Sequence, residues 1–115
     1  MIDYDHILES LRNSWSIESS SRYCKNNPAC GQCSVTSIVI QRKYGGKVLK
    51  TKVEGRWHFY NQIDNSVYDF TKEQFQKEIE YSNEASSIEE ALTDCTIEQL
   101  EALWRLFSKR VERNE

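Results

Sequence analysis

The chain has 115 residues, the size of one domain, and we expect residues 1–115 to fold as a single unit. Hydrophobic residues make up 38% of the sequence and charged residues 29%, a balance that excludes a disordered chain. The formal net charge is −3, with Lys and Arg scattered along the sequence. This pattern argues against nucleic acid or an anionic membrane as a partner.

No stretch approaches the roughly 18 consecutive apolar residues of a membrane span. Residues 1–5 carry neither the basic region nor the apolar run of a signal peptide. We therefore expect a cytoplasmic protein. In a reducing compartment cysteines are free thiols, ligands or catalysts rather than disulfides. The cysteines of this chain are Cys24, Cys30, Cys33 and Cys95.

Two helices are predicted in the first half of the chain. Within 5–15, apolar side chains recur at helical spacing, namely Ile7, Leu8, Leu11 and Trp15. The stretch 16–28 is polar and is predicted to be irregular. A second helix begins at Gly31 or Gln32 and runs to Tyr44, and its β-branched, apolar content indicates a buried helix.

The second half begins with a change to a two-residue period, which indicates strands. Three strands are predicted, over 47–53, 56–63 and 66–70. Asp64-Asn65 stands between the last two, where a tight hairpin turn is expected. Residues 71–74 have the form of a capping box that starts a helix, and Thr96 starts the last helix in the same way. Helices on a small antiparallel sheet make an α+β fold.

Cys33 is the main candidate for chemistry, because it is predicted to open the buried second helix. The first N–H groups of a helix have no internal partner and carry partial positive charge. They favour the thiolate, which is the reactive form of cysteine. The free N–H of Cys33 itself can also point at a carbonyl oxygen under attack, which supplies half of an oxyanion hole. The alternative is a buried cysteine that acts as a small hydrophobic residue.

A thiol nucleophile needs a base, and the base needs a group that orients it. His6 is expected on the exposed side of the first helix, so His58, in the middle of an aromatic-rich strand, is the candidate base. If Asp64-Asn65 forms the turn, Tyr60 pairs with Asp69, and His58 shares a face with Asp69 at a diagonal position. We expect the Asp69 carboxylate to reach Nδ1–H of His58 and to fix its tautomer.

The order Cys, His, Asp, with the cysteine at a helix start and the other two on adjacent strands, resembles the papain-like fold. Transglutaminases, NlpC-type peptidases and glutamine-deamidating toxins share that arrangement. At closer range the chain resembles the YunG-like family of small bacterial proteins over roughly residues 14–75. The motifs that carry this resemblance are Ser14-Trp15-Ser16, Asn27-Pro28, Gly31-Gln32-Cys33, Val35-Thr36, Gly45-Gly46, His58-Phe59-Tyr60-Asn61 and Asp69-Phe70-Thr71.

The resemblance implies a papain-like site with Cys33 as nucleophile, His58 as base and Asp69 as orienting residue. Papain-like proteases place an oxyanion glutamine several residues before the cysteine, whereas here Gln32 is adjacent and Asn27 occupies the more distant position. The expected reaction is cofactor-independent acyl transfer from an amide. A short chain has little material for a peptide groove, which favours an amide on a small molecule or a protein side chain. A monomer and a homodimer are both compatible with the sequence.

Three alternatives remain open. Cys30 and Cys33 form a C-x-x-C motif, as in redox proteins, although no βαβ unit is predicted around it. Cys24, Cys30 and Cys33 could bind zinc with His58 or Cys95 as a fourth ligand, although one of the usual close cysteine pairs is missing. The chain could also keep the fold and act only as a binding protein, because fold does not fix function.

Overall fold

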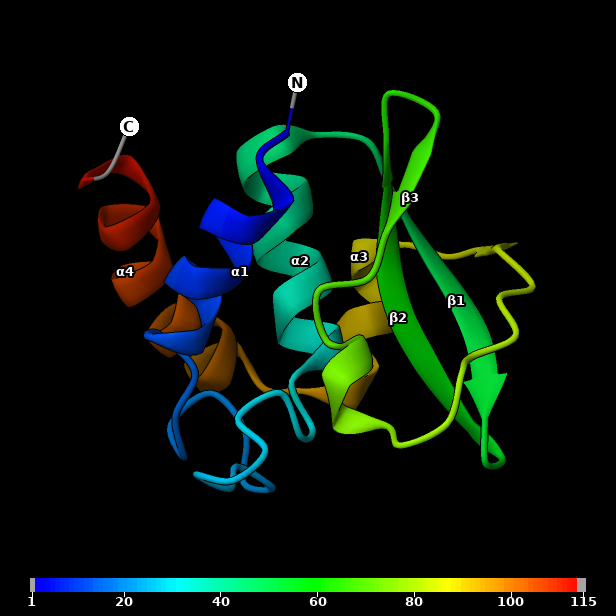
Figure 1. The fold of residues 1–115 in the computed structure, drawn as a ribbon, viewed down its shortest axis with the longest axis horizontal. Helices are drawn as coiled ribbons and strands as arrows, with labels where there is room; N and C mark the ends of the chain where they lie inside the picture. Colours follow the sequence, from blue (N-terminus) through cyan, green and yellow to red (C-terminus); the bar gives the residue numbers. More distant parts are fainter. Residues whose placement is uncertain (1, 114–115) are drawn as a thin grey trace.

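A sheet and a group of helices form two layers in the structure, a computed structural model that describes residues 2–113 (Figure 1). All described strands pair antiparallel, in the order β3-β2-β1-β4. The strands are β1 (Lys47–Val53), β2 (Arg56–Ile63), β3 (Ser66–Tyr68) and β4 (Glu84–Ala85). The α-helices are α1 (Tyr4–Arg12), α2 (Cys33–Tyr44), α3 (Ile88–Ala91) and α4 (Ile97–Arg113). The predicted α+β class is confirmed.

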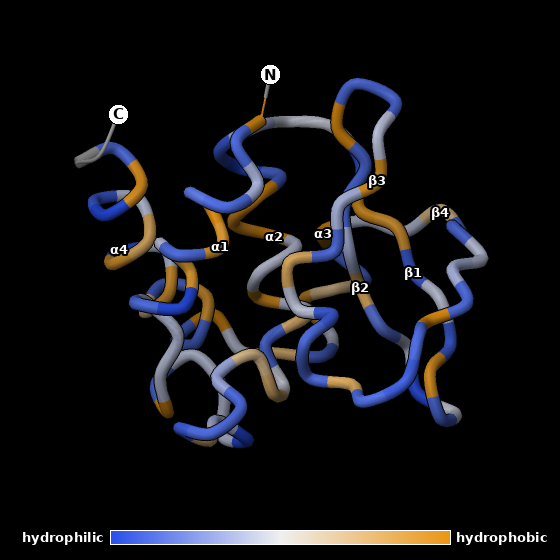
Figure 2. The backbone as a smooth tube through the Cα atoms, in the orientation of Figure 1, coloured by the Kyte–Doolittle hydropathy of each residue, from blue (hydrophilic) through white to orange (hydrophobic). Residues whose placement is uncertain are grey.

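Helix α2 lies at the centre of the molecule, between the sheet and the pair α1 and α4 (Figure 1). It is buried from Cys33 to Ile40, as its apolar and β-branched sequence predicted. Helices α1 and α4 are amphipathic, and Figure 2 shows hydrophobic segments where the helices face one another. The three helices and the sheet share one hydrophobic cluster, whose fully buried members include Leu11, Val35, Val39, Leu103 and Phe107. Burial of each such side chain contributes about 1.5–3 kcal/mol.

The β2–β3 hairpin has the predicted register. Ile63 pairs with Ser66 across the two-residue turn, and the next two pairs follow without a bulge. Asp64 and Asn65 both adopt positive φ, at 50° and 68°, which is the geometry of a tight hairpin turn. This register carries the chain to Asp69 directly after β3 ends.

The predicted end of the first helix is wrong, and a tertiary contact explains why. Helix α1 ends at Arg12 instead of at Trp15. Trp15 is nevertheless buried, and its indole Nε1–H donates a hydrogen bond of 2.9 Å to Thr36 Oγ1 on α2. The tryptophan therefore reaches the core from the loop after the helix.

The helix predicted at 71–74 is also wrong, since the chain makes only a short 3₁₀ turn, η1 (Lys72–Gln74). Thr71 does not cap a helix, because its N–H and hydroxyl both donate to the carboxylate of Asp69. The capping box of α4 is confirmed by reciprocal hydrogen bonds between Thr96 and Gln99. Strand β4, helix α3 and the 3₁₀ turn η2 (Leu92–Asp94) were not predicted.

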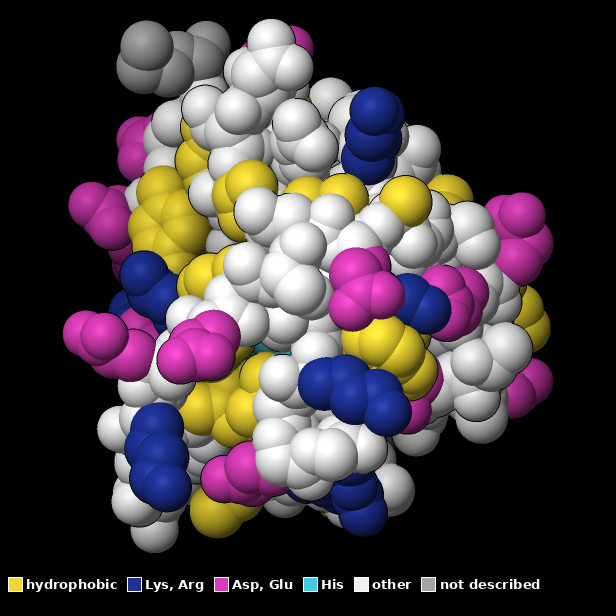
Figure 3. Space-filling view, turned by 90° about the vertical axis from the view of Figure 1, so that its right-hand side faces the viewer, with side chains coloured by type: hydrophobic (Ala, Val, Ile, Leu, Met, Phe, Trp, Pro, Cys, Tyr) yellow, Lys and Arg dark blue, Asp and Glu magenta, His cyan; other side chains and the backbone are white. Residues whose placement is uncertain are grey.

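No helix within 2–113 has the length and apolar character needed to cross a bilayer. On the face shown in Figure 3, Lys and Arg side chains are interspersed with Asp and Glu. No single-sign region of the kind that binds polyanions covers that face.

Candidate active site

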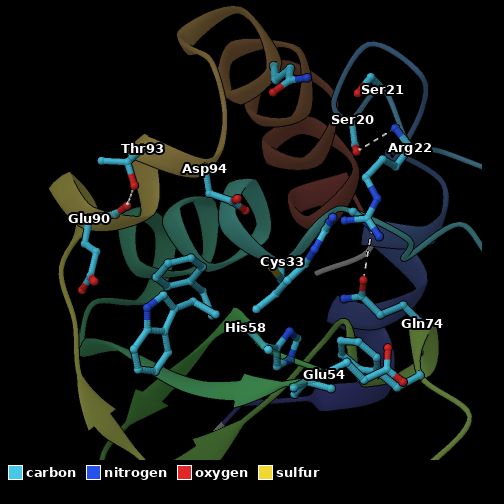
Figure 4. Close-up of a pocket in the computed structure, with 18 residues that line it drawn as sticks. Ser20, Ser21, Arg22, Cys33, Glu54, His58, Gln74, Glu90, Thr93 and Asp94 are labelled. Carbon is cyan, nitrogen blue, oxygen red and sulfur yellow. Dashed lines mark hydrogen bonds between the residues drawn. The ribbon is translucent and has the colours of Figure 1, made fainter.

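Cys33 is the first residue of α2, where the sequence placed it. Gln32 is the N-cap residue, and no side chain caps the helix, so the first-turn N–H groups keep no capping partner. The thiol is 9% exposed and lines a cavity of about 850 Å³ at the junction of the helical layer and the sheet. His58 lines the same cavity (Figure 4).

His58 and Asp69 are in contact, as the diagonal pairing of β2 and β3 predicted. Nε2 of His58 lies 2.7 Å from Oδ2 of Asp69, and both side chains are almost fully buried. The nitrogen differs from the expectation, which gave this contact to Nδ1. The carboxylate approaches from beyond the end of the neighbouring strand, so it meets the far tip of the ring. Nδ1 is buried and makes no hydrogen bond of regular geometry among residues 2–113.

Both carboxylate oxygens of Asp69 accept further hydrogen bonds, which fix the side chain in place. Oδ1 accepts from the Thr71 N–H at 3.1 Å and from its hydroxyl at 3.3 Å. Oδ2 accepts the Tyr81 hydroxyl at 2.8 Å besides His58. A carboxylate that accepts several hydrogen bonds is stabilised in its charged form. These hydrogen bonds fix the position of the Asp69 carboxylate against the imidazole.

The surroundings of His58 favour the imidazolium. Burial acts to lower the pKa of His58, but the hydrogen bond to Asp69 and the interaction with the Cys33 thiol outweigh burial and raise the pKa from 6.5 to about 9. The ring of Phe75 packs edge-on against the imidazole at 5.0 Å and shields it from water. The contribution of Cys33 to this shift indicates that its thiol lies close to the imidazole ring.

Gln74 is a site residue that the sequence analysis missed. It lines the cavity with Cys33, and its Oε1 accepts the backbone N–H of Gly31 at 3.2 Å. Its Nε2 is buried and has no hydrogen-bond partner among the described residues. Figure 4 shows this nitrogen on the side of the amide that faces Cys33. The only sequence signal was its place in an apparent capping box, which pointed to a helix start instead.

Gln32 and Asn27, the two oxyanion candidates, do not line this cavity. The Gln32 side chain is fully buried and holds the preceding loop, since its Oε1 accepts from Ser19 Oγ at 2.8 Å and its Nε2 donates to Ser16 O at 3.4 Å. Asn27 Nδ2 donates to the backbone carbonyl of Gln74 at 3.2 Å. Both residues thus support the frame around the cysteine and direct no donor into the cavity.

The other cysteines do not join Cys33 in a cluster. Cys24 is exposed, Cys30 is half-buried, and neither lines the cavity of Cys33. Within the described part of the chain no three His, Cys, Asp or Glu side chains converge as metal ligands. The zinc-site alternative needed Cys24, Cys30, Cys33 and His58 to converge in this way. Burial raises the pKa of the Cys95 thiol, which makes it unreactive near neutral pH.

His6 lies away from the site, as expected, but it is not a solvated residue. It is half-buried, and its Nε2 lies 2.9 Å from the backbone carbonyl of Val111 in α4. The hydrogen bond joins the two outer helices. His58 is therefore the only described histidine near a cysteine in the cavity.

The comparison with known families agrees with the motifs around this site. The family model described as "YunG protein" matches residues 3–112. The chain belongs to the YunG family. A YunG relative from Bacillus subtilis (strain 168), described as "Uncharacterized protein YunG", is 49% identical over 107 residues that cover 93% of each chain. The match includes the whole segment that carries Cys33, His58, Asp69 and Gln74.

No solved structure matches this YunG chain. The geometry of the site therefore stands on the contacts described above. Cys33, His58 and Gln74 line one cavity, and Asp69, which does not line it, holds Nε2 of His58. A thiol, an imidazole and a carboxylate are the groups that nucleophilic catalysis by cysteine uses.

Proposed function

We propose that this YunG protein is a thiol-dependent acyl-transfer enzyme with a papain-like site, in which Cys33 is the nucleophile, His58 the acid and base, and Asp69 the orienting residue. The observation that carries the proposal is the hydrogen bonding of the His58 ring. Nε2 lies 2.7 Å from Oδ2 of Asp69, whereas Nδ1 is buried and has no hydrogen-bond partner among the described residues. A ring held in this way presents one nitrogen for proton transfer.

In the first half of the reaction the Cys33 sulfur attacks the carbonyl carbon of an amide. The carbonyl oxygen becomes an oxyanion, and we assign its stabilisation to Gln74 Nε2 and to the backbone N–H of Cys33. The C–N bond then breaks, and the leaving amine takes the proton from Nδ1 of His58. The products of this half are a thioester on Cys33 and a free amine.

In the second half water attacks the thioester carbon. Nδ1 of His58 accepts a proton from that water, and the sulfur leaves as thiolate. A carboxylic acid is released, and the pair of Cys33 thiolate and His58 imidazolium is restored. An amine in place of water gives transfer instead of hydrolysis by the same steps.

The size of the cavity favours a small substrate. A volume of about 850 Å³ is within the range of small-molecule sites, and the short β1–β2 and β2–β3 turns provide no long groove for a peptide. The proposed substrate is an amide on a small molecule or on a protein side chain. We place the reaction in the cytoplasm, where the four free thiols stay reduced.

Acylation by an activated ester tests the proposal without knowledge of the substrate. The protein is treated with 4-nitrophenyl acetate at pH 7, and the acetylated residues are mapped by mass spectrometry. We expect a thioester on Cys33 that water or hydroxylamine removes, and no burst of 4-nitrophenol in Cys33→Ala. Cys24→Ser is the matched control, since Cys24 is the exposed thiol of the chain. Acetylation of Cys24 ahead of Cys33 would show that exposure alone governs reactivity, and the proposal would then be wrong.

A further inference from the structure

Four charged side chains that line the cavity of Cys33 have no ion-pair partner among the described residues, and two of them, Arg22 and Asp94, lie on either side of the thiol. Arg22 and Asp94 make no side-chain hydrogen bond or ion pair with any described residue. Figure 4 shows them on opposite sides of Cys33, with Arg22 from the loop before α2 and Asp94 from the end of η2. An unpaired cation and an unpaired anion thus flank the proposed nucleophile.

The position of Arg22 is set by a glycine. Gly31 adopts φ +73°, and a Cβ built on it would lie 2.8 Å from Cβ of Arg22 and 2.5 Å from Oγ of Ser20. The Arg22 stem therefore packs on the backbone of Gly31, two residues before Cys33, where no other residue type fits. Ser20 Oγ accepts the Arg22 backbone N–H at 3.1 Å and fixes this turn. The guanidinium is thereby held at the rim of the cavity.

The position of Asp94 is set by the segment that joins η2 to α4. Its neighbour Cys95 is half-buried, and its thiol donates a hydrogen bond of 3.7 Å to the backbone carbonyl of Ala91. Asp94 is thereby held near the start of α2, on the side opposite Arg22. Its carboxylate is exposed and free to bind a cation.

The remaining charges of the cavity nearly cancel. Glu90 is paired with Lys50, whose ammonium also lies 4.1 Å from the centre of the Trp57 ring. Glu54 and Arg56 have opposite signs and stand on either side of Gly55 in the β1–β2 turn. Glu54 and Arg56 form no ion pair, but their opposite charges lie next to each other in this turn, whereas Arg22 and Asp94 lie on opposite sides of the thiol (Figure 4).

We propose that the substrate of this site is a small zwitterionic amide, with a carboxylate that Arg22 binds and an ammonium group that Asp94 binds. The inference rests on the proposed function, since both charges would position the scissile carbonyl over Cys33. Guanidinium binds carboxylate through two parallel hydrogen bonds, which fixes orientation as well as position. Neither Arg22 nor Asp94 takes part in making or breaking a bond. An amino acid with an amide in its side chain has this chemistry.

Four 4-nitroanilides with the same scissile bond test this inference. γ-Glutamyl-4-nitroanilide carries both charges, the glutaryl compound only the carboxylate, the 4-aminobutyryl compound only the ammonium, and the butyryl compound neither. We expect kcat/KM to be highest for the γ-glutamyl compound and to fall at least about fivefold with each missing charge, as for single charge-assisted contacts. Equal rates across the series would overturn the inference.

Two variants, each of which removes one charge, test which residue binds the carboxylate and which binds the ammonium group. Arg22→Gln should lower kcat/KM only for the two compounds with a carboxylate, and Asp94→Asn only for the two with an ammonium. Lys25→Gln and Asp64→Asn are matched controls, since both residues are exposed and lie outside the cavity lining. If a variant lowers kcat/KM equally for all four compounds, the substitution disturbs the structure of the site, and the assignment of that residue to one charge would be wrong.

The outcomes separate this inference from the proposed function. If none of the four anilides is cleaved while 4-nitrophenyl acetate acylates Cys33, the substrate class is wrong and the thiol chemistry stands. If neither anilides nor ester react at Cys33, the thiol chemistry itself is wrong. Cleavage that survives in Cys33→Ala would likewise show that the thiol chemistry is wrong.

Discussion

The backbone N–H of Gly31 donates a hydrogen bond of 3.2 Å to Oε1 of Gln74. An N–H group must face an oxygen, so this contact decides which way the Gln74 amide is oriented. The Nε2 group is left buried without a partner on the side of the cavity. A buried donor of this kind is costly unless a ligand satisfies it, and an oxyanion above Cys33 would do so.

Replacement of Gln74 by Ala should therefore slow turnover without changing the reactivity of the Cys33 thiol. We expect kcat/KM for a cleaved anilide to fall about 100-fold, the usual loss for one oxyanion donor. The alkylation rate of Cys33 by iodoacetamide should stay within about twofold, because alkylation forms no oxyanion. Gln76→Ala is the control, since Gln76 is exposed on the same segment. Equal losses in both reactions would indicate a structural role for Gln74.

Replacement of His58 by Ala should remove the enhanced reactivity of Cys33. A neighbouring imidazolium stabilises a thiolate, so the wild-type cysteine should react with iodoacetamide at pH 6 faster than the exposed Cys24. In His58→Ala we expect the rate at Cys33 to fall at least about tenfold, while Cys24 is unchanged. Peptide mapping after timed alkylation measures both rates in one sample. An unchanged rate at Cys33 would exclude His58 from the site.

The stability of the Cys33→Ala variant should fall as the pH rises above neutrality. This variant is used because a Cys33 thiolate in the folded wild-type protein gives up one proton and offsets the proton that His58 keeps. The pKa of His58 is raised from 6.5 to about 9, so the folded state retains a proton that the unfolded state releases. The resulting stabilisation is complete below pH 6.5 and is lost as the pH approaches 9. In Cys33→Ala, where Asp69 still holds the imidazole, we expect the free energy of unfolding to fall between pH 7 and 8, by at most about 1.4 kcal/mol per pH unit in urea unfolding.

Asp69→Asn, made in the same Cys33→Ala protein, is the control for this pH dependence. It removes the charge that raises the pKa of His58 and leaves burial, which lowers that pKa. We expect the slope between pH 7 and 8 to be reduced by at least half. The same slope in both proteins would mean that another group causes the pH dependence.

Replacement of Tyr81 by Phe should destabilise the protein through Asp69. The substitution removes the 2.8 Å hydrogen bond to Oδ2 and keeps the ring that packs on Tyr60 at 4.9 Å. A hydrogen bond to a charged group contributes about 1.5–3 kcal/mol, and we expect a loss near the lower value because Tyr81 is partly exposed. Tyr68→Phe is the control, because no hydrogen bond of its hydroxyl joins it to another described residue. Equal losses in urea unfolding for the two variants would contradict the role given to Tyr81.

Gly46→Ala should be far more harmful than Gly45→Ala. Both glycines adopt φ +80°, so both substitutions carry backbone strain. A Cβ on Gly46 would lie 2.1 Å from the carbonyl oxygen of Gln62, whereas a Cβ on Gly45 meets nothing within 4 Å. We expect an additional loss of at least about 2 kcal/mol for Gly46→Ala in urea unfolding. Similar values for the two variants would indicate that the β2 backbone can move away.

The sequence by itself determined the local elements and their neighbours. The apolar periods defined α1, α2 and the strands, the Thr96–Gln99 pair defined the start of α4, and the Asp64-Asn65 turn set the register of β2 and β3. From that register followed the contact between His58 and Asp69. These features depend on residues close in sequence, whose geometry is dictated by backbone periodicity and turn type.

Only the tertiary structure decided which atoms meet at the site. In the structure Asp69 contacts Nε2 of His58 instead of Nδ1. Thr71 donates a hydrogen bond to Asp69 instead of starting a helix. The tertiary structure also brought Gln74 against Gly31, 43 residues away in the chain, and left Gln32 bound to its own loop. Such contacts depend on how separate segments approach one another, and a polar side chain has several partners of similar energy until packing leaves only one within reach.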